Sequence, residues 1–243
     1  MIRQLGRYLL FTFRAFSGMG YVLKRPRLIL DQIYYLGLRS LPVASFTAIF
    51  IGMVVTLVTS YQLEAELPRF YLGATGGRTL LIELAPVVIS LLVVARVGSN
   101  ITARIGTMKV TEQIDALETM GINAEHYLAL PIILAGVIVV PILVIYCDLI
   151  GLVAATVSAK LILNVSPDVY IFGLRRFVEL KDVLGGLLKT ILFGLTMGSV
   201  SSHYGFETGL GAEGVGESVT FSVVTSASMI MIIDFIVAYL VFR

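Results

Sequence analysis

The sequence predicts an all-α integral membrane protein, and three observations lead to this prediction. Of the 243 residues, 57% are hydrophobic and only 14% are charged, whereas soluble domains carry about 25% charged residues. The mean hydropathy is +0.93. Uncharged runs recur along the chain, and a helix that crosses a bilayer needs roughly 20 apolar residues. The chain therefore has room for about five or six membrane helices and for no soluble catalytic domain.

The rest of the composition excludes several kinds of site. The net charge is +2, from 18 basic and 16 acidic residues, so it indicates no nucleic-acid partner. Cys147 is the single cysteine, which excludes an internal disulfide and a site with several thiolates. With only two histidines besides, we expect neither a metal site nor a cofactor in this chain.

Residues 1–39 are strongly basic, and we expect interfacial helices there, ahead of a transmembrane domain at residues 40–243. Arg3, Arg7 and Arg14 fall within about 40° of one another on a helix that turns about 100° per residue. The opposite face carries Leu5, Leu9, Phe13 and Phe16. This pattern predicts a helix lying in the cytoplasmic membrane interface. A secretory signal is the alternative, but Arg14 interrupts its apolar run and no small-residue cleavage site follows.

Five spans are expected, which leaves the amino end in the cytoplasm and the carboxyl end outside. They lie at residues 41–63, around the uncharged run 84–95, and at residues 127–159, 183–204 and 218–242. The second run is only about 18 Å long as a helix, so its span must take in or abut Glu83 and Arg96. The third would reach about 50 Å, which indicates one helix kinked near Pro141 or two short spans. Residues 64–78 and 160–182 are then outer loops.

Two glycine motifs call for different interpretations. Gly194 and Gly198 form a GxxxG in the fourth span, which permits close helix packing, although glycine is common in membrane helices anyway. Residues 209–214, GLGAEG, match the dinucleotide pattern GxGxxG, but they join two membrane helices, so we interpret them as a turn. No GxxxxGK[ST] phosphate loop and no GxSxG or HExxH spacing is present. Nothing in the sequence therefore indicates an enzyme.

The segment 107–121 predicts a short amphipathic helix in a cytoplasmic loop. Val110, Ile114 and Leu117 share one face at helical spacing. The flank is acidic and a glycine follows as the stop: Glu112, Asp115, Glu118 and Gly121. A solvated interfacial helix is one interpretation. The other is a docking element, because an apolar ridge with acidic edges can fit a groove on a partner.

Residues 95–121, ARVGSNITARIGTMKVTEQIDALETMG, resemble the signature of the MlaE/YrbE family, the permeases of MCE-type ABC lipid transporters. Residues 83–88 (ELAPVV), Pro131 and residues 211–216 (GAEGVG) match as well. The resemblance covers nearly the whole chain from about Leu36. One departure is Arg104, which stands where the family tends to carry an acid.

The resemblance implies a homodimeric, multi-pass permease in the bacterial inner membrane. Two cytoplasmic ATPase subunits would bind the ATP, and MCE-domain proteins would form a ring on the periplasmic side. The cargo would be a phospholipid or a related lipid, moved between the inner and outer membranes. Segment 107–121 would be the coupling helix that contacts the ATPase.

Five charged residues lie within or beside the spans: Glu83, Arg96, Asp148, Lys189 and Asp234. A charge at the middle of a membrane costs about 2.5 to 3.5 kcal/mol on insertion scales, so each needs a partner or water. The expected topology places Glu83, Asp148, Lys189 and Asp234 in the outer third of the membrane and Arg96 near the inner face. One interpretation is snorkelling ends plus a buried pair of Lys189 with Asp234. The preferred one is a hydrated cavity that receives a lipid head group.

Two other function classes compete with a lipid permease. An ion-coupled secondary transporter or channel would also place charges in its spans, but such proteins often contain inverted repeats, which this sequence does not show. An intramembrane lipid-modifying enzyme would need a nucleophile or a metal set, and neither is visible. Co-purification of an ATPase would separate the permease from both.

Overall fold

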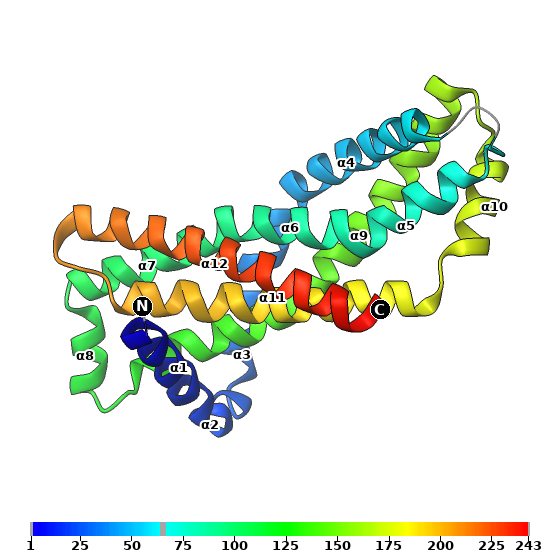
Figure 1. Cartoon of the computed structure of the whole chain (residues 1–243). Coiled ribbons are helices and arrows are strands. Elements are labelled where there is room, and N and C mark those ends of the chain that lie inside the picture. The colour runs from blue at the N-terminus through cyan, green and yellow to red at the C-terminus, as the bar shows by residue number, and fades with distance from the viewer. Residues whose placement is uncertain (1, 64–66, 243) are drawn as a thin grey trace. The chain divides into compact units, whose positions relative to one another are not determined.

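The computed structural model describes residues 2–63 and 67–242, with the side chains of residues 6–63 and 67–241. These residues form helices joined by short connections and include no strand (Figure 1). The helices are α1 Ile2–Ser17, α2 Met19–Leu23, α3 Pro26–Gly37, α4 Leu41–Gln62, α5 Gly77–Thr79, α6 Ala85–Val93, α7 Ser99–Val110, α8 Gln113–Thr119, α9 Leu130–Leu163, α10 Pro167–Phe177, α11 Leu180–Phe206 and α12 Gly211–Phe242. The fold is therefore the all-α architecture that the sequence predicts.

Five helical segments are long and apolar enough to cross a membrane, as predicted. They are Pro26–Gln62, Leu72–Val110, Glu125–Leu163, Leu180–Phe206 and Gly211–Val241. The second segment takes in both Glu83 and Arg96, because π-helical turns at Leu72–Gly76, Leu80–Leu84 and Val94–Gly98 join its α-helical pieces. Its helical structure starts within the predicted outer loop 64–78, of which residues 64–66 lie outside the description.

The third span is one helix. α9 runs through Pro141 without a break, so of the two alternatives the single long helix is correct. A π-helical turn, Glu125–Ala129, directly precedes α9 and extends the helical structure towards the amino end. At about 1.5 Å per residue, α9 alone is about 50 Å long, enough to project beyond a bilayer core.

The predicted outer loop 160–182 is not a simple loop, because it contains α10. Pro167 occupies the first turn of this helix, Asp168 lies in that turn and Arg175 and Arg176 lie in the last. Tyr170 is buried against Leu72 and Ala155. A Cβ on Gly73 would overlap the carbonyl oxygen of Tyr170, so the two backbones pack in direct contact. The proline and the charge pattern were sequence signals for this helix.

Contacts group the described chain into two compact units. One comprises the residues up to Ser40 together with Leu91–Val140 and Ile191–Ile233. The other comprises Leu41–Ser90, Pro141–Thr190 and the residues from Asp234 onward. The first unit has a core of Phe11, Ala15, Ala129 and Ile133, and the second has cores around Tyr170 and around Leu80.

The amino-terminal helix α1 has two apolar sides. Phe11 and Ala15 are buried in the core of their unit, and Phe16 packs against it. Leu9 and Phe13 are exposed, which suits the membrane contact predicted for that face. Phe16 therefore belongs to the inward side and not to the predicted outer face. The side chains of Arg3 and Leu5 lie outside the described residues.

Close helix packing at the predicted GxxxG is confirmed. A Cβ on Gly194 would overlap the carbonyl oxygen of Gly136 in α9. A Cβ on Gly198 would stand 2.8 Å from the Cα of Ile133. Both glycines of α11 thus let its backbone approach the backbone of α9.

Candidate functional site

Lys189 is the centre of a charge cluster within the second unit. Its side chain is fully buried, and Nζ donates hydrogen bonds to Oε1 of Glu83 at 2.6 Å and to the carbonyl oxygen of Ile82 at 3.4 Å. Nζ also forms an ion pair with Oδ1 of Asp234 at 2.9 Å. The three charged residues come from α11, from the π-helical turn Leu80–Leu84 and from α12. The pair of Lys189 with Asp234, one of the two interpretations of the sequence, is therefore present, and Glu83 is a second partner of Lys189.

The two carboxylates are more accessible than the ammonium group. Glu83 is 37% exposed and Asp234 is 19% exposed, whereas Lys189 is 0% exposed. A buried ammonium needs opposite charge because desolvation is expensive, and here it has two carboxylates. The formal charge of the cluster is −1, so it presents a net negative, partly open face within the membrane-spanning segments.

A second ion pair, like that of Glu83 with Lys189, joins the second span to α11. Arg78 binds Asp182 through two contacts, Nε to Oδ2 at 2.9 Å and Nη2 to Oδ1 at 3.0 Å. Asp182 is fully buried and also accepts the backbone N–H of Glu179 at 3.1 Å. Along the chain, Arg78 comes before Glu83, and their partners Asp182 and Lys189 follow in the same order. The two ion pairs therefore join two segments that run parallel. Sequence reasoning missed this pair because both residues were assigned to outer loops.

The other two predicted cavity residues have different surroundings. Asp148 on α9 is 9% exposed, and the part of the chain that the structure describes gives its side chain no hydrogen bond or ion pair. Arg96 donates a hydrogen bond to the carbonyl oxygen of Arg39. The direct contacts at Lys189 thus involve Glu83 and Asp234 and neither of these residues. A role of Asp148 or Arg96 in a lipid cavity stays a prediction.

The predicted coupling segment 107–121 is not one helix. α7 ends at Val110, and α8 starts only at Gln113 after a turn at Thr111 and Glu112, which Figure 1 shows as a sharp change of direction. Glu112 has φ 59°, a left-handed conformation that no helix interior accepts. Gly121 ends α8 with φ 75°, as its place in the sequence predicts. The apolar residues do lie at helical spacing, but Val110 belongs to α7, whereas Ile114 and Leu117 belong to α8.

The apolar ridge of this segment faces its own chain. Ile114 is buried at 6% exposure, and Val110 and Leu117 are half-buried. The acidic side chains Glu112, Asp115 and Glu118 are all exposed, as is Met120. The surface that α8 offers to a partner is therefore acidic with one exposed methionine, and Ile114 holds the helix in place.

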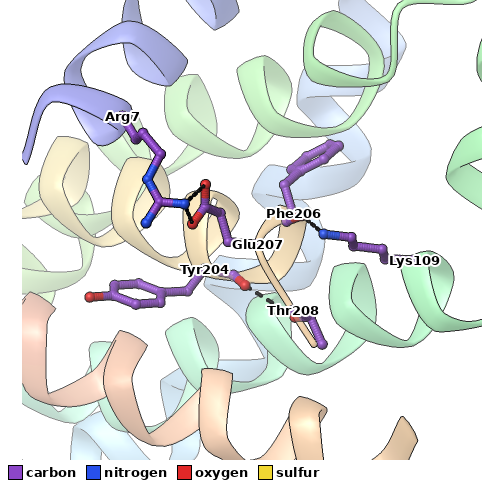
Figure 2. Close-up of polar contacts among 6 residues, drawn as sticks. All are labelled: Arg7, Lys109, Tyr204, Phe206, Glu207 and Thr208. Carbon is purple, nitrogen blue, oxygen red and sulfur yellow. Dashed lines mark hydrogen bonds and ion pairs between the residues drawn. The ribbon is translucent and has the colours of Figure 1, made fainter. Parts of the chain in front are cut away.

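Polar contacts tie the end of α11 to α7 and α1. Figure 2 shows Lys109, next to the end of α7, donating a hydrogen bond to the carbonyl oxygen of Phe206. On the other side, Arg7 forms an ion pair with Glu207 at 2.9 Å. Thr208 donates to the carbonyl oxygen of Tyr204 at 3.1 Å and caps the helix end. A displacement of α7 would thus act directly on the end of α11.

Fold and charge pattern together define a multi-pass membrane protein with a buried, partly open charge cluster in its spans. The model of the family described as Permease MlaE matches residues 29–240. The chain belongs to this family.

Similar proteins are named as ABC transporter permeases. The chain is 34% identical over 244 residues to the probable ABC transporter permease protein RT0041 of Rickettsia typhi, covering 99% of this chain and 93% of the relative. It is 35% identical over 214 residues to the probable ABC transporter permease protein slr1045 of Synechocystis, covering 88% and 81%. A third relative is Protein TRIGALACTOSYLDIACYLGLYCEROL 1, chloroplastic, of Arabidopsis thaliana, 32% identical over 218 residues, covering 88% and 61%. The chain is thus an ABC transporter permease subunit.

Proposed function

We propose that this permease moves a phospholipid or a related lipid between the inner and outer membranes of a bacterial cell. The observation that carries the proposal is the fully buried Lys189 between two partly exposed carboxylates. Membrane proteins keep such charges where a polar substrate or water enters. The chloroplast relative adds support, because its name contains a galactolipid.

The cluster supplies a polar surface in an otherwise apolar setting. A lipid that leaves the bilayer carries its head group past the hydrocarbon core, which is unfavourable without polar contacts. Glu83 and Asp234 can accept hydrogen bonds from an ammonium or hydroxyl group of the head group. The ammonium group of Lys189 lies between them and offsets the repulsion of two neighbouring acids.

The proposed partners are those that the resemblance to the MlaE family implies. A separate cytoplasmic ATPase subunit binds the ATP and docks at α7 and α8, with Asp115 and Glu118 on the contact surface. The chain works as a homodimer in the inner membrane with its amino end in the cytoplasm. An MCE-domain protein receives or delivers lipid on the periplasmic side.

An ion-coupled transporter is the second candidate, because charged groups inside spans also serve ion pathways. Transport of labelled phospholipid in proteoliposomes, containing the permease and its co-purified ATPase, separates the two. We expect transport that needs ATP hydrolysis and is lost in Lys189→Met. The matched variant Lys160→Met, at an exposed lysine near the end of α9, should transport like the parent. Transport driven by an ion gradient without ATP, or a fully active Lys189→Met, would reject the proposal.

A further inference from the structure

Two arginines lie at the ring of Tyr35 in the unit that contains α1, and a third is hydrogen-bonded to the backbone of one of them. The guanidinium carbon of Arg39 lies 4.8 Å from the ring centroid, and that of Arg104 lies 5.5 Å from it. Both distances suit cation–π contacts. Arg96 joins them through its hydrogen bond to the carbonyl oxygen of Arg39. The arginines come from the turn Leu38–Ser40, the π-helical turn Val94–Gly98 and α7, so the fold and not the local sequence assembles them.

The hydrogen-bond and ring partners that the structure gives these arginines are neutral groups. Arg104 donates to Oε1 of Gln32 at 3.2 Å, and the hydroxyl of Tyr35 donates to Oδ1 of Asn100 at 2.8 Å. Within residues 6–63 and 67–241, no carboxylate forms an ion pair with any of the three arginines, although Arg7 and Arg78 each have one. Like charges held together repel, and an anion among them removes that repulsion.

Two of the three arginines stand at the ends of uncharged runs, where a membrane helix passes from hydrocarbon to head groups. Arg39 stands just before the uncharged run 41–63, and Arg96 directly follows the uncharged run 84–95. Arg39 and Arg96 are exposed, and Arg104 is half-buried. Tyr34 and Leu38 beside them are exposed as well, which gives an apolar surface for acyl chains. Basic residues at such a boundary meet lipid phosphates.

We propose that Arg39, Arg96 and Arg104 form a binding site for the phosphate of an anionic phospholipid, in the leaflet on the side of the amino-terminal helices. Each guanidinium can donate paired N–H groups to phosphate oxygens. The ring of Tyr35 orients two of the guanidiniums. The formal charge of +3 selects anionic over zwitterionic head groups, in contrast to the net negative cluster at Lys189. The site does not depend on the proposed lipid transport.

The test is saturable binding of phosphatidylglycerol to the purified full-length chain in neutral detergent, measured by native mass spectrometry. The ionic strength should be high enough to screen unpaired surface charge. We expect affinity to fall about fivefold for each arginine replaced by glutamine, and about 100-fold for the triple variant Arg39→Gln, Arg96→Gln, Arg104→Gln. The matched control is Arg27→Gln, which removes one exposed charge from α3 and should leave binding unchanged.

A charge-preserving variant covers the case in which the triple glutamine variant does not fold. With all three arginines replaced by lysine, binding should weaken through loss of the paired N–H groups, while phosphatidylglycerol stays preferred over phosphatidylcholine. Parent-like binding by the glutamine variant, an equal loss in Arg27→Gln, or equal binding of phosphatidylcholine would overturn the site. Displacement of the lipid by an equal concentration of inorganic phosphate would show a site for free anions instead.

Discussion

At the scale of residues, the charge cluster is asymmetric. One ammonium group serves two carboxylates, so the loss of Lys189 and the loss of a carboxylate have different effects. Without Lys189 both acids lack compensation, whereas without one acid the other still pairs with the lysine. The asymmetry gives a stability test that needs no transport assay.

We predict that Lys189→Met lowers the free energy of unfolding by about 3 to 5 kcal/mol, the range found when one partner of a buried pair is removed. Glu83→Gln and Asp234→Asn should each cost less than half of that, because an ion pair remains. Thermal unfolding of the three variants in one detergent provides the measurement. Equal losses in all three would mean that Lys189 is not the centre of the cluster.

The sequence predicted the pairing of Lys189 with Asp234 from depth alone, because their spans are antiparallel neighbours. It could not predict Glu83 as the shortest contact, since rotational phase depends on packing between spans. It also missed the Arg78–Asp182 pair, whose residues stand where hydropathy indicates loops.

At the scale of elements, α8 combines a buried residue with an acidic outer face. Ile114 holds the helix to its own chain, and Asp115 and Glu118 face outward. The apolar periodicity that indicated a docking ridge therefore reports internal packing, at least at Ile114. The break at Glu112 was invisible because a left-handed residue other than glycine has no strong signature.

We predict that the double variant Asp115→Lys, Glu118→Lys reduces ATPase co-purification about tenfold, because close charge pairs at an interface contribute to affinity. Its thermal stability should not change, because both side chains are exposed. Ile114→Asp should instead destabilise the permease, because it buries an unpaired carboxylate. Both variants are compared by pull-down and by thermal unfolding. Normal ATPase binding by the double lysine variant would exclude this face of α8 as the docking surface.

Backbone contact between α9 and α11 leads to a third prediction. Gly194→Ala would place a methyl group on the carbonyl oxygen of Gly136, so it should destabilise by about 1 to 3 kcal/mol. Gly216→Ala on α12 meets nothing within 4 Å and should be neutral or stabilise by up to about 1 kcal/mol. Unfolding in detergent measures both, and a neutral Gly194→Ala would contradict the close approach.

At the scale of the whole molecule, five helical segments are long and apolar enough to cross a membrane. Five crossings would place the two ends of the chain on opposite sides. The number of spans and the composition of each were predictable, because a membrane span needs an apolar run of about 20 residues, which is visible in the sequence. Their ends were less predictable, since π-helical turns extend the second span past its charges. The side on which each end lies rests on the basic amino-terminal segment.

Orientation can be tested by cysteine labelling in spheroplasts, because the native Cys147 is buried and gives no background. Gly20→Cys, at an open and exposed position, should stay unlabelled by an impermeant maleimide. Lys160→Cys, at the far end of α9, should be labelled. The reverse pattern would place the amino end outside.

The two ion pairs between residues 78–83 and 182–189 have a mechanical consequence. A single ion pair lets two helical segments pivot about the point of contact. A second ion pair further along the same segments prevents that rotation. Sliding of one helical segment along the other would likewise have to strain both ion pairs at once. We therefore expect the part of the second span around Glu83 and the first half of α11 to move as one body during a transport cycle. Hinges would then have to lie outside that body, in segments free of such double attachment.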